Sequence, residues 1–323
     1  MAKKEKQSLQ DVLLGIQKDF GEGILTSAIE EMGQLEVIPF SIPSMNRITG
    51  IGGIGKGRIT EFHGMDGTFK TTFCLDLISQ CQKMGGTAAF IDAEYSFSAE
   101  YAEVLGVDNE KLILIHPSSA EEAFTIIEKL VDSGQVDLIV LDSIASLSPS
   151  TELANDFGAS NMGVMARLMG QFFRKITAKA GKTNTALVFI NQLREMLGGY
   201  VPMKTTPAGN AIKFYASMRF EITKSAIKNG TDTIGVNLKV KCVKNKLAKP
   251  FLITEVEAMY GQGINIQKDV VNEAIESGVI QKGGAWLTYE NEKYQGYDTF
   301  VKLLKDNPEF EQALITKIKN QLK

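Results

Sequence analysis

The sequence predicts an α/β protein with one mostly parallel, doubly wound sheet and a small second α/β domain at its C-terminal end. Short, continuously apolar runs alternate with segments of helical periodicity over residues 58–190, which is typical of parallel strands buried on both faces. From about residue 266 the pattern becomes largely helical. At 323 residues, 44% of them hydrophobic, the chain is long enough to bury one large core and a smaller satellite core.

Each element is expected where its periodicity is clearest. Strands are expected at 58–63, 87–92, 111–115, 137–142 and 185–190, and helices at 70–83, 119–132 and 163–180. Later strands follow one another without long helices, so we expect them to be antiparallel, at 217–223, 235–243 and 252–258. The last helix is expected to begin at Asn307–Pro308, with an apolar face formed by Phe310, Leu314, Ile318 and Leu322.

A short helix is also expected near the N-terminus, ended by Gly21 and Gly23, with one apolar face formed by Leu9, Val12, Leu13, Ile16 and Phe20. A single helix of this length is marginally stable in water, so its apolar stripe needs a surface on which to dock. The sequence leaves two possibilities open, the core of its own chain and a neighbouring subunit.

Composition limits the classes of protein that fit this chain. No apolar stretch is long enough to cross a bilayer, and no signal-peptide pattern follows the Lys-rich start, so we expect a cytoplasmic protein without membrane contact. Cys74, Cys81 and Cys242 have no spacing that indicates a disulfide framework or a zinc site. The net charge of −3 argues mildly against nucleic acid, so any DNA site must come from a local concentration of Lys and Arg.

The first candidate site is the segment GMDGTFKTT, which follows the first expected strand. A phosphate-binding loop needs inward backbone N–H groups, a lysine for the β- and γ-phosphates and a hydroxyl for Mg²⁺, all at a helix N-terminus. The spacing fits, although Phe69 stands where a glycine is expected before Lys70. The residues expected to contact nucleotide here are Gly64, Asp66, Gly67, Thr68, Phe69, Lys70, Thr71 and Thr72.

Carboxylates end two of the expected strands, at the edge where open α/β sheets bind ligands. Asp92 and Glu94 lie two residues apart, so they point to the same side if the chain is extended there. Such a carboxylate is suited to orient the water that attacks a γ-phosphate, but a solvated strand end fits equally well. Asp142 ends the apolar run LIVLD, where an aspartate typically partners the phosphate loop by holding Mg²⁺ directly or through water.

Polar residues and irregular segments follow at the same edge. Asn191 and Gln192 end the strand expected at 185–190 and are placed to sense a γ-phosphate. Two irregular segments, 151–163 and 194–210, leave this edge, and segments of that kind are usually functional or disordered.

Basic residues gather in residues 239–249, which hold five lysines and no acid. Such a run forms either a binding surface or a solvated sheet edge that resists aggregation. On the helix expected at 163–180, Arg167 and Arg174 share one face. The opposite, Met-containing face favours core packing and is formed by Met165, Leu168, Met169 and Phe172.

From Gly57 to about Asn265 the sequence resembles the RecA family of recombinases, with weaker similarity toward both ends. The matching segments are GRITEFHG (57–64), FIDAEYSF (90–97), LIVLDSIASLSP (138–149), NMGVMARLM (161–169), FINQLR (189–194), GNAIKFYAS (209–217), CVKNKLAKPF (242–251) and YGQGIN (260–265). Phe before the lysine of the phosphate loop resembles T-even phage recombinases of the UvsX type, so we expect a phage-encoded member.

The resemblance implies an ATP site with bound Mg²⁺ and assigns a role to each matching residue. Lys70 and Thr71 would hold phosphates and Mg²⁺, and Asp142 would be the second magnesium partner. Glu94 would activate water, and Gln192 would couple the γ-phosphate to the DNA-binding loop. Tyr101 would stack on adenine, and Tyr260 with Gly261 would also contact the nucleotide. Lys244 and Lys246 would reach into the ATP site of the neighbouring subunit.

The resemblance also implies that the two irregular segments line a filament axis and hold DNA. Met162 and Leu197 match apolar residues that wedge between bases. Lys204 and Pro207 depart from the family pattern of the second segment. The other positions expected near DNA are Gly163, Arg167, Arg174, Arg194, Gly198, Gly209, Asn210 and Lys213. Phe214 matches a subunit-interface residue, and the N-terminal helix then corresponds to the arm that docks on the next protomer.

We therefore expect a DNA-dependent ATPase that forms helical filaments on single-stranded DNA and exchanges strands with homologous duplex DNA. Single-strand-binding and loading proteins are expected partners, and the bacterial cytosol is the expected location. The expected domains are an N-terminal arm (1–32), an ATPase and DNA-binding core (33–265) and a small C-terminal domain (266–323). Two alternatives stay open, a hexameric helicase or accessory ATPase with the same core, and a filament-forming scaffold that Phe69 has made inactive in hydrolysis.

Overall fold

The computed structural model describes residues 8–21, 24–25, 35–154, 163–195, 204–205 and 210–321. Contacts divide the chain into two compact units, Met1–Glu36 and Val37–Lys323. In the first unit, helix α1 (Leu9–Phe20) is capped by Ser8, whose hydroxyl accepts from the backbone N–H of Asp11, and it ends at Gly21. The helix expected near the N-terminus is therefore confirmed. In the described part of the chain no helix is both long and apolar enough to span a membrane.

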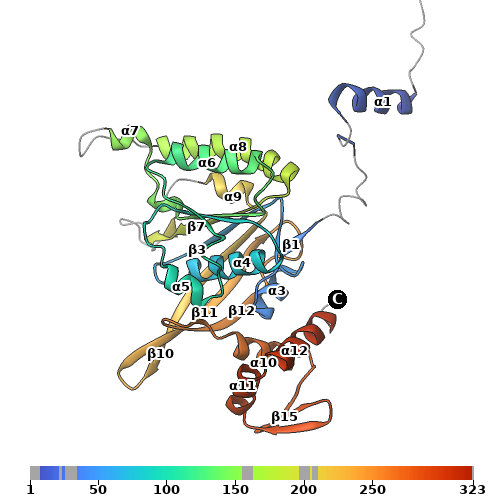
Figure 1. Ribbon diagram of the computed structural model, residues 1–323, viewed down its shortest axis with the longest axis vertical. Helices are drawn as coiled ribbons and strands as arrows, with labels where there is room; N and C mark the ends of the chain where they lie inside the picture. Colours follow the sequence, from blue (N-terminus) through green and yellow to red (C-terminus); the bar gives the residue numbers. More distant parts are fainter. Residues whose placement is uncertain are drawn as a thin grey trace, which may run out of the picture. The chain divides into compact units, whose positions relative to one another are not determined.

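The second unit is built on a large sheet (Figure 1). This sheet has nine strands in the order β13-β12-β11-β10-β3-β7-β6-β4-β5. The five strands from β3 to β5 in that order run parallel. Their bounds are β3 (Ile59–Gly64), β4 (Ala88–Asp92), β5 (Ile113–Ile115), β6 (Leu138–Asp142) and β7 (Ala186–Gln192). All but β5 are fully or almost fully buried. The apolar runs of β4, β6 and β7 predict this burial, whereas β3 also buries Thr60, Glu61 and His63.

The remaining strands of the sheet form an antiparallel extension, as expected from the lack of helices between them. They are β10 (Met218–Asn229), β11 (Asp232–Asn245), β12 (Ile253–Met259) and β13 (Gly263–Ile264). The sequence pattern did not predict that β10 also pairs in parallel with β3, with Ile222 opposite Gly64. Strands β10 and β11 form a long hairpin whose tip extends beyond the rest of the sheet (Figure 1).

Helices cover both faces of this sheet (Figure 1). One face packs against α4 (Lys70–Lys83) in a core that includes Phe62, Phe73 and Phe220. The other face packs against α6 (Ala120–Asp132) and α8 (Val164–Thr183), with the short α9 (Ala211–Tyr215) against α8. The sequence therefore predicted the α/β class and the alternation of strands and helices correctly.

Short elements connect these layers. They are β1 (Val37–Ile38), α3 (Pro43–Thr49), β2 (Ile54–Gly55), α5 (Ala99–Val104), α7 (Ser150–Leu153), β8 (Arg194–Glu195) and β9 (Lys204–Thr205). The C-terminal segment has its own apolar core around Phe300, Leu304 and Leu314. It consists of α10 (Ile266–Glu276), β14 (Gln281–Gly283), β15 (Trp286–Tyr289), β16 (Glu292–Gln295), α11 (Tyr297–Asp306) and α12 (Pro308–Gln321).

Candidate nucleotide-binding site

The phosphate loop lies between the end of β3 and the start of α4, so the positive end of the α4 dipole faces it. Gly64 has no room for a side chain, because a Cβ atom there would lie 2.6 Å from the carbonyl oxygen of Ile222. Phe69, the N-cap of α4, has left-handed backbone angles of φ 58° and ψ 27°. Glycine adopts this conformation without steric cost, which explains physically why a glycine is expected at that position.

Lys70 is the first residue of α4, and its side chain turns back into the loop. Its Nζ donates to the carbonyl oxygen of Met65 at 2.9 Å and contacts the hydroxyl of Thr68 at 3.3 Å. Burial lowers the pKa of Lys70, whereas the nearby carboxylates of Asp142 and Asp66 act in the opposite direction. These acids therefore favour the charged ammonium, the form that binds phosphate oxygens.

Thr71 and Asp142 bring a hydroxyl and a carboxylate together below the loop. The Thr71 hydroxyl donates to Oδ2 of Asp142 at 2.5 Å. The pKa of Asp142 is raised to about 7, chiefly by burial and in part by the Glu94 carboxylate, while the Thr71 hydrogen bond opposes this shift. Within the described residues no group of three or more His, Cys, Asp or Glu side chains is placed to hold a metal ion. A hydroxyl and one carboxylate nevertheless fit Mg²⁺, which keeps several waters and takes other oxygens from phosphates.

Glu94 is held in place by hydrogen bonds from three side chains. Its Oε1 accepts from the Ser143 hydroxyl at 2.5 Å, the Gln192 amide at 2.8 Å and the Ser146 hydroxyl at 3.2 Å. Gln192 ends β7 and Ser143 directly follows β6, so neighbouring parallel strands deliver both partners. The sequence did not single out the two serines, although both lie in the quoted segment LIVLDSIASLSP.

Asp92 and Asn191 bind other parts of the protein and do not line the cavity that the phosphate loop, Glu94 and Gln192 form. Asp92 is buried and accepts backbone N–H groups from Glu94, Ser96 and Phe97, so it shapes the turn after β4. Asn191 is buried in the sheet and donates to Oε1 of Glu61 at 3.0 Å. Strand alternation explains the difference, because adjacent residues of β7 point to opposite faces. The expectation that Asn191 senses phosphate is therefore wrong.

Two tyrosines complete the cavity. The Tyr101 hydroxyl lies 2.9 Å from that of Thr72 on α4. The ring of Tyr260 stacks on Phe69 with centroids 5.9 Å apart. The cavity has a volume of about 320 Å³, and its lining residues are Asp66, Gly67, Thr68, Phe69, Lys70, Thr71, Thr72, Glu94, Tyr101, Asp142, Ile190, Gln192, Tyr260 and Gly261. Ile190 is the only one of these that the sequence did not indicate.

Lys244 and Lys246 lie elsewhere on the chain, outside this cavity. Their ammonium groups donate to the carbonyl oxygen of Phe214 at 3.0 Å and 3.2 Å, and Lys244 also donates to that of Lys213 at 2.6 Å. These carbonyls belong to the last turn of α9, where cations are favoured. Phe214 itself is 72% exposed. The two lysines and an exposed aromatic ring therefore lie together at the surface.

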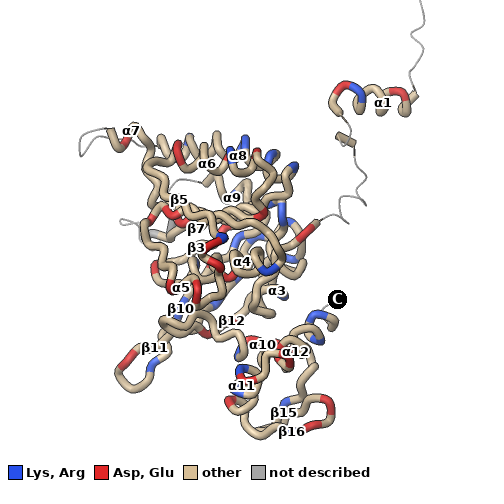
Figure 2. Tube along the Cα trace, viewed as in Figure 1, with Lys and Arg blue, Asp and Glu red and all other residues tan. Residues whose placement is uncertain are grey.

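The residues expected near DNA are placed less completely. Arg167 and Arg174 are exposed on α8, whose other face buries Met169 and Phe172. Figure 2 shows Lys and Arg residues recurring along this helix. Gly163 is the N-cap of α8, while Asn210 and Lys213 lie at α9. The side chain of Arg194 lies outside the described part of the structure, as do the whole residues Met162, Leu197, Gly198 and Gly209.

The lysines of residues 239–249 divide between two settings. On β11, Lys239 lies 3.9 Å from the carboxylate of Glu255, and Lys241 lies 5.7 Å from the centre of the Phe251 ring. These contacts agree with a solvated sheet surface, whereas Lys244 and Lys246 contact α9.

Comparison with known proteins adds an independent finding. Residues 7–265 match the family model of the RecA N-terminal domain, and residues 268–323 match that of the RecA C-terminal domain. The chain is 42% identical to the protein RecA of Thermus aquaticus over 98% of its own length and 95% of that protein. It is 44% identical to the protein RecA of Chloroherpeton thalassium, with 95% and 86% of the two chains covered.

Proposed function

The chain belongs to the RecA family of recombinases, which are DNA-dependent ATPases, and on this premise we propose that its cavity binds and hydrolyses ATP. The observation that carries the proposal is the convergence of Lys70, Thr71, Asp142, Glu94 and Gln192 on one cavity of about 320 Å³. A cation, a hydroxyl–carboxylate pair and a held carboxylate are the groups that phosphoryl transfer to water requires.

The phosphates are proposed to bind at the N-terminus of α4, where the helix dipole and Lys70 attract negative charge. Thr71 and Asp142 would hold Mg²⁺, which supplies charge neutralisation on the phosphate oxygens. The adenine is proposed to lie near Tyr101, and Tyr260 with Gly261 would close the other side of the cavity.

Glu94 is the proposed base for the attacking water. In the described chain its hydrogen bonds from Ser143, Ser146 and Gln192 all reach Oε1, which leaves Oε2 to accept from water. Gln192 is positioned between this carboxylate and the start of the irregular segment at 194–210. A γ-phosphate that moves Glu94 would therefore move Gln192 and the DNA-binding segment with it.

We propose that protomers assemble into a helical filament on single-stranded DNA and pair it with homologous duplex DNA. Lys244, Lys246 and exposed Phe214 form the surface that would meet the next protomer's nucleotide. The DNA contacts are proposed for Arg167, Arg174, Lys213 and the two irregular segments that follow β6 and β7. Helix α1, with its exposed Leu9 and Phe20, would dock on a neighbouring protomer.

Single-strand-binding and loading proteins are proposed partners, and the bacterial cytosol is the proposed location. We also propose a phage origin, because Phe69 resembles the residue before the lysine in T-even phage recombinases. The relatives named above are bacterial, so sequencing the genes that flank this one is the direct test of that origin.

Replacing Glu94 with glutamine tests the hydrolytic site. We expect the Glu94→Gln variant to lose about 100-fold or more of its single-stranded-DNA-dependent ATP hydrolysis, since a positioned base contributes roughly 10²–10⁴-fold. Nucleotide binding should persist, because Lys70 and Thr71 are unchanged. A matched control is Glu103→Gln, which removes an exposed carboxylate on α5 and should leave turnover unchanged.

If the ATP turnover of the Glu94→Gln variant stays within twofold of the wild-type value, Glu94 is not the base. A wild-type protein that forms filaments but hydrolyses no ATP with single-stranded DNA would favour the inactive scaffold. Electron micrographs that show ATP-dependent hexameric rings instead of filaments would favour a helicase.

A further inference from the structure

A second lysine, Lys224, contacts the phosphate loop, although it lies far from the loop in the sequence. It lies on β10, two residues after Ile222, which pairs with Gly64 at the end of β3. Its Nζ donates to the carbonyl oxygen of Asp66 at 2.8 Å. The β10–β11 hairpin is therefore anchored at its base to the loop that precedes α4.

Gly64 allows the hairpin backbone to approach this closely, and Gly67 leaves room for the Lys224 ammonium group. A Cβ atom on Gly64 would lie 2.6 Å from the backbone oxygen of Ile222, and one on Gly67 would lie 2.6 Å from Nζ of Lys224. Gly67 also has φ +64°, a conformation that glycine adopts without strain. The loop backbone is thus shaped to receive both the β10 strand and the Lys224 ammonium group.

The contact determines which way one peptide group of the loop points. In a trans peptide the carbonyl of Asp66 and the N–H of Gly67 point in opposite directions. Lys224 holds the carbonyl on the hairpin side, so the N–H points away from the hairpin. There it donates to Oδ1 of Asp66 at 2.9 Å, and both residues line the nucleotide cavity.

Lys70 holds the preceding carbonyl in the same manner. Its Nζ donates to the carbonyl oxygen of Met65 at 2.9 Å, one residue before the carbonyl that Lys224 holds. Two ammonium groups, one from α4 and one from β10, therefore fix successive carbonyls of the loop. A phosphate loop works only when its N–H groups face the ligand, which requires its carbonyls to be held elsewhere.

We propose that Lys224 is a positioning residue for ATP, acting through the Asp66–Gly67 peptide to keep the loop in its phosphate-binding shape. The inference rests on the proposed function, because it assumes that this cavity binds the phosphates of ATP. Lys224 tightens nucleotide binding and has no part in the chemical step, in which Glu94 is the proposed base.

The test compares three variants by titration with a fluorescent ATP analogue in the absence of DNA. Lys224→Met should weaken binding by about five- to tenfold, since a charge-assisted hydrogen bond that orders the loop is lost. Lys224→Arg keeps the charge and the donor, so it should bind within twofold of wild type. Lys228→Met is the matched control, because Lys228 is an exposed lysine farther along the same strand.

Steady-state ATP hydrolysis with single-stranded DNA separates positioning from chemistry. For Lys224→Met we expect KM for ATP to rise by about the same factor as the dissociation constant, with kcat within twofold of wild type. Thermal unfolding without nucleotide should match wild type, because Lys224 is exposed. Lys224→Gln provides a second neutral variant if the methionine variant folds poorly.

Unchanged nucleotide binding in both neutral variants would overturn the inference. So would a fall in kcat at constant KM, or equal weakening by Lys228→Met, since these would indicate a DNA contact or a general charge effect. A wild-type protein that binds no ATP analogue would instead overturn the proposed function, which distinguishes the two failures.

Discussion

Phe69 combines an unfavourable backbone with a favourable ring contact. Its φ of 58° places the residue in the left-handed region, which costs a non-glycine residue about 1–2 kcal/mol. Its ring stacks on Tyr260 and packs against the apolar core next to α4. The sequence identified Phe69 as a departure from the usual loop, but the stacking partner lies nearly two hundred residues away along the chain.

Alanine and glycine at position 69 separate the backbone cost from the ring contact. Both variants lose the stacking on Tyr260, but only alanine keeps a Cβ atom in the left-handed conformation. We expect Phe69→Gly to be more stable than Phe69→Ala by about 1 kcal/mol, part of the backbone gain being offset by the freedom of glycine in the unfolded chain. Urea unfolding measures the difference. Equal stability would contradict a left-handed backbone at this position.

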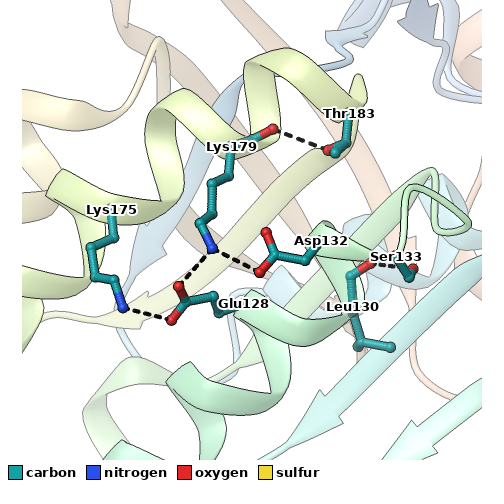
Figure 3. Close-up of polar contacts among 7 residues, drawn as sticks. All are labelled: Glu128, Leu130, Asp132, Ser133, Lys175, Lys179 and Thr183. Carbon is teal, nitrogen blue, oxygen red and sulfur yellow. Dashed lines mark hydrogen bonds and ion pairs between the residues drawn. The ribbon is translucent and has the colours of Figure 1, made fainter.

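Helices α6 and α8 are joined by two kinds of contact. The rings of Phe124 and Phe172 stack in the core with centroids 4.3 Å apart. At the surface, Lys179 bridges Glu128 and Asp132, and Lys175 also donates to Glu128 (Figure 3). The buried ring contact removes apolar area from water, whereas the ion pairs stay solvated and gain little.

Removal of each contact should therefore have very different effects. We expect Phe172→Ala to lower the free energy of unfolding by about 3–4 kcal/mol, because it leaves a cavity between α6, α8 and the sheet. Lys179→Met should change the melting temperature by no more than about 2 °C, because its partners are solvated. Thermal and urea unfolding of both variants check this order. A larger effect from Lys179→Met would contradict it.

Across the second unit, buried acids join the sheet core to the C-terminal segment. Asp269 of α10 accepts from the backbone N–H of Ser44 on α3 at 3.0 Å, and Arg47 of α3 pairs with Glu273 at 2.6 Å. The pKa of Asp269 is raised to about 7, chiefly by burial and in part by the Glu273 carboxylate, while the Ser44 hydrogen bonds oppose the shift. Burial also raises the pKa of Glu273, which the Arg47 charge opposes.

This contact should make stability depend on pH. The folded protein holds the Asp269 proton more tightly than the unfolded chain does, so the free energy of unfolding falls as pH rises from about 4 to about 7. One such group contributes at most about 1.4 kcal/mol per pH unit. Urea unfolding at several pH values should therefore show a flatter dependence for Asp269→Asn. The exposed Asp306→Asn serves as control, and equal slopes in wild type and Asp269→Asn would contradict the prediction.

Much of the site could be predicted because its residues follow strand ends. Glu94, Asp142 and Gln192 each lie at or just after a buried apolar run, Lys70 follows the loop after β3, and parallel strands end at one edge. The roles of Ser143 and Ser146 were not predictable in this way. Their hydrogen bonds to Glu94 depend on how the chain turns after β6, and periodicity carries no information about that turn.

The α/β class, the alternation of elements and the strand ends that carry the candidate ATP site could be predicted before the fold was known, because they follow from local periodicity. Which strands are neighbours became evident only in the folded chain, where β10 runs parallel to β3 and brings Lys224 onto the phosphate loop. There Gln192 also faces Glu94, while Asn191 turns to Glu61. The spacing of apolar residues along a strand or helix indicates which face of that element is buried. It does not indicate which other segments pack against that face, because folding brings together segments that are distant in the sequence.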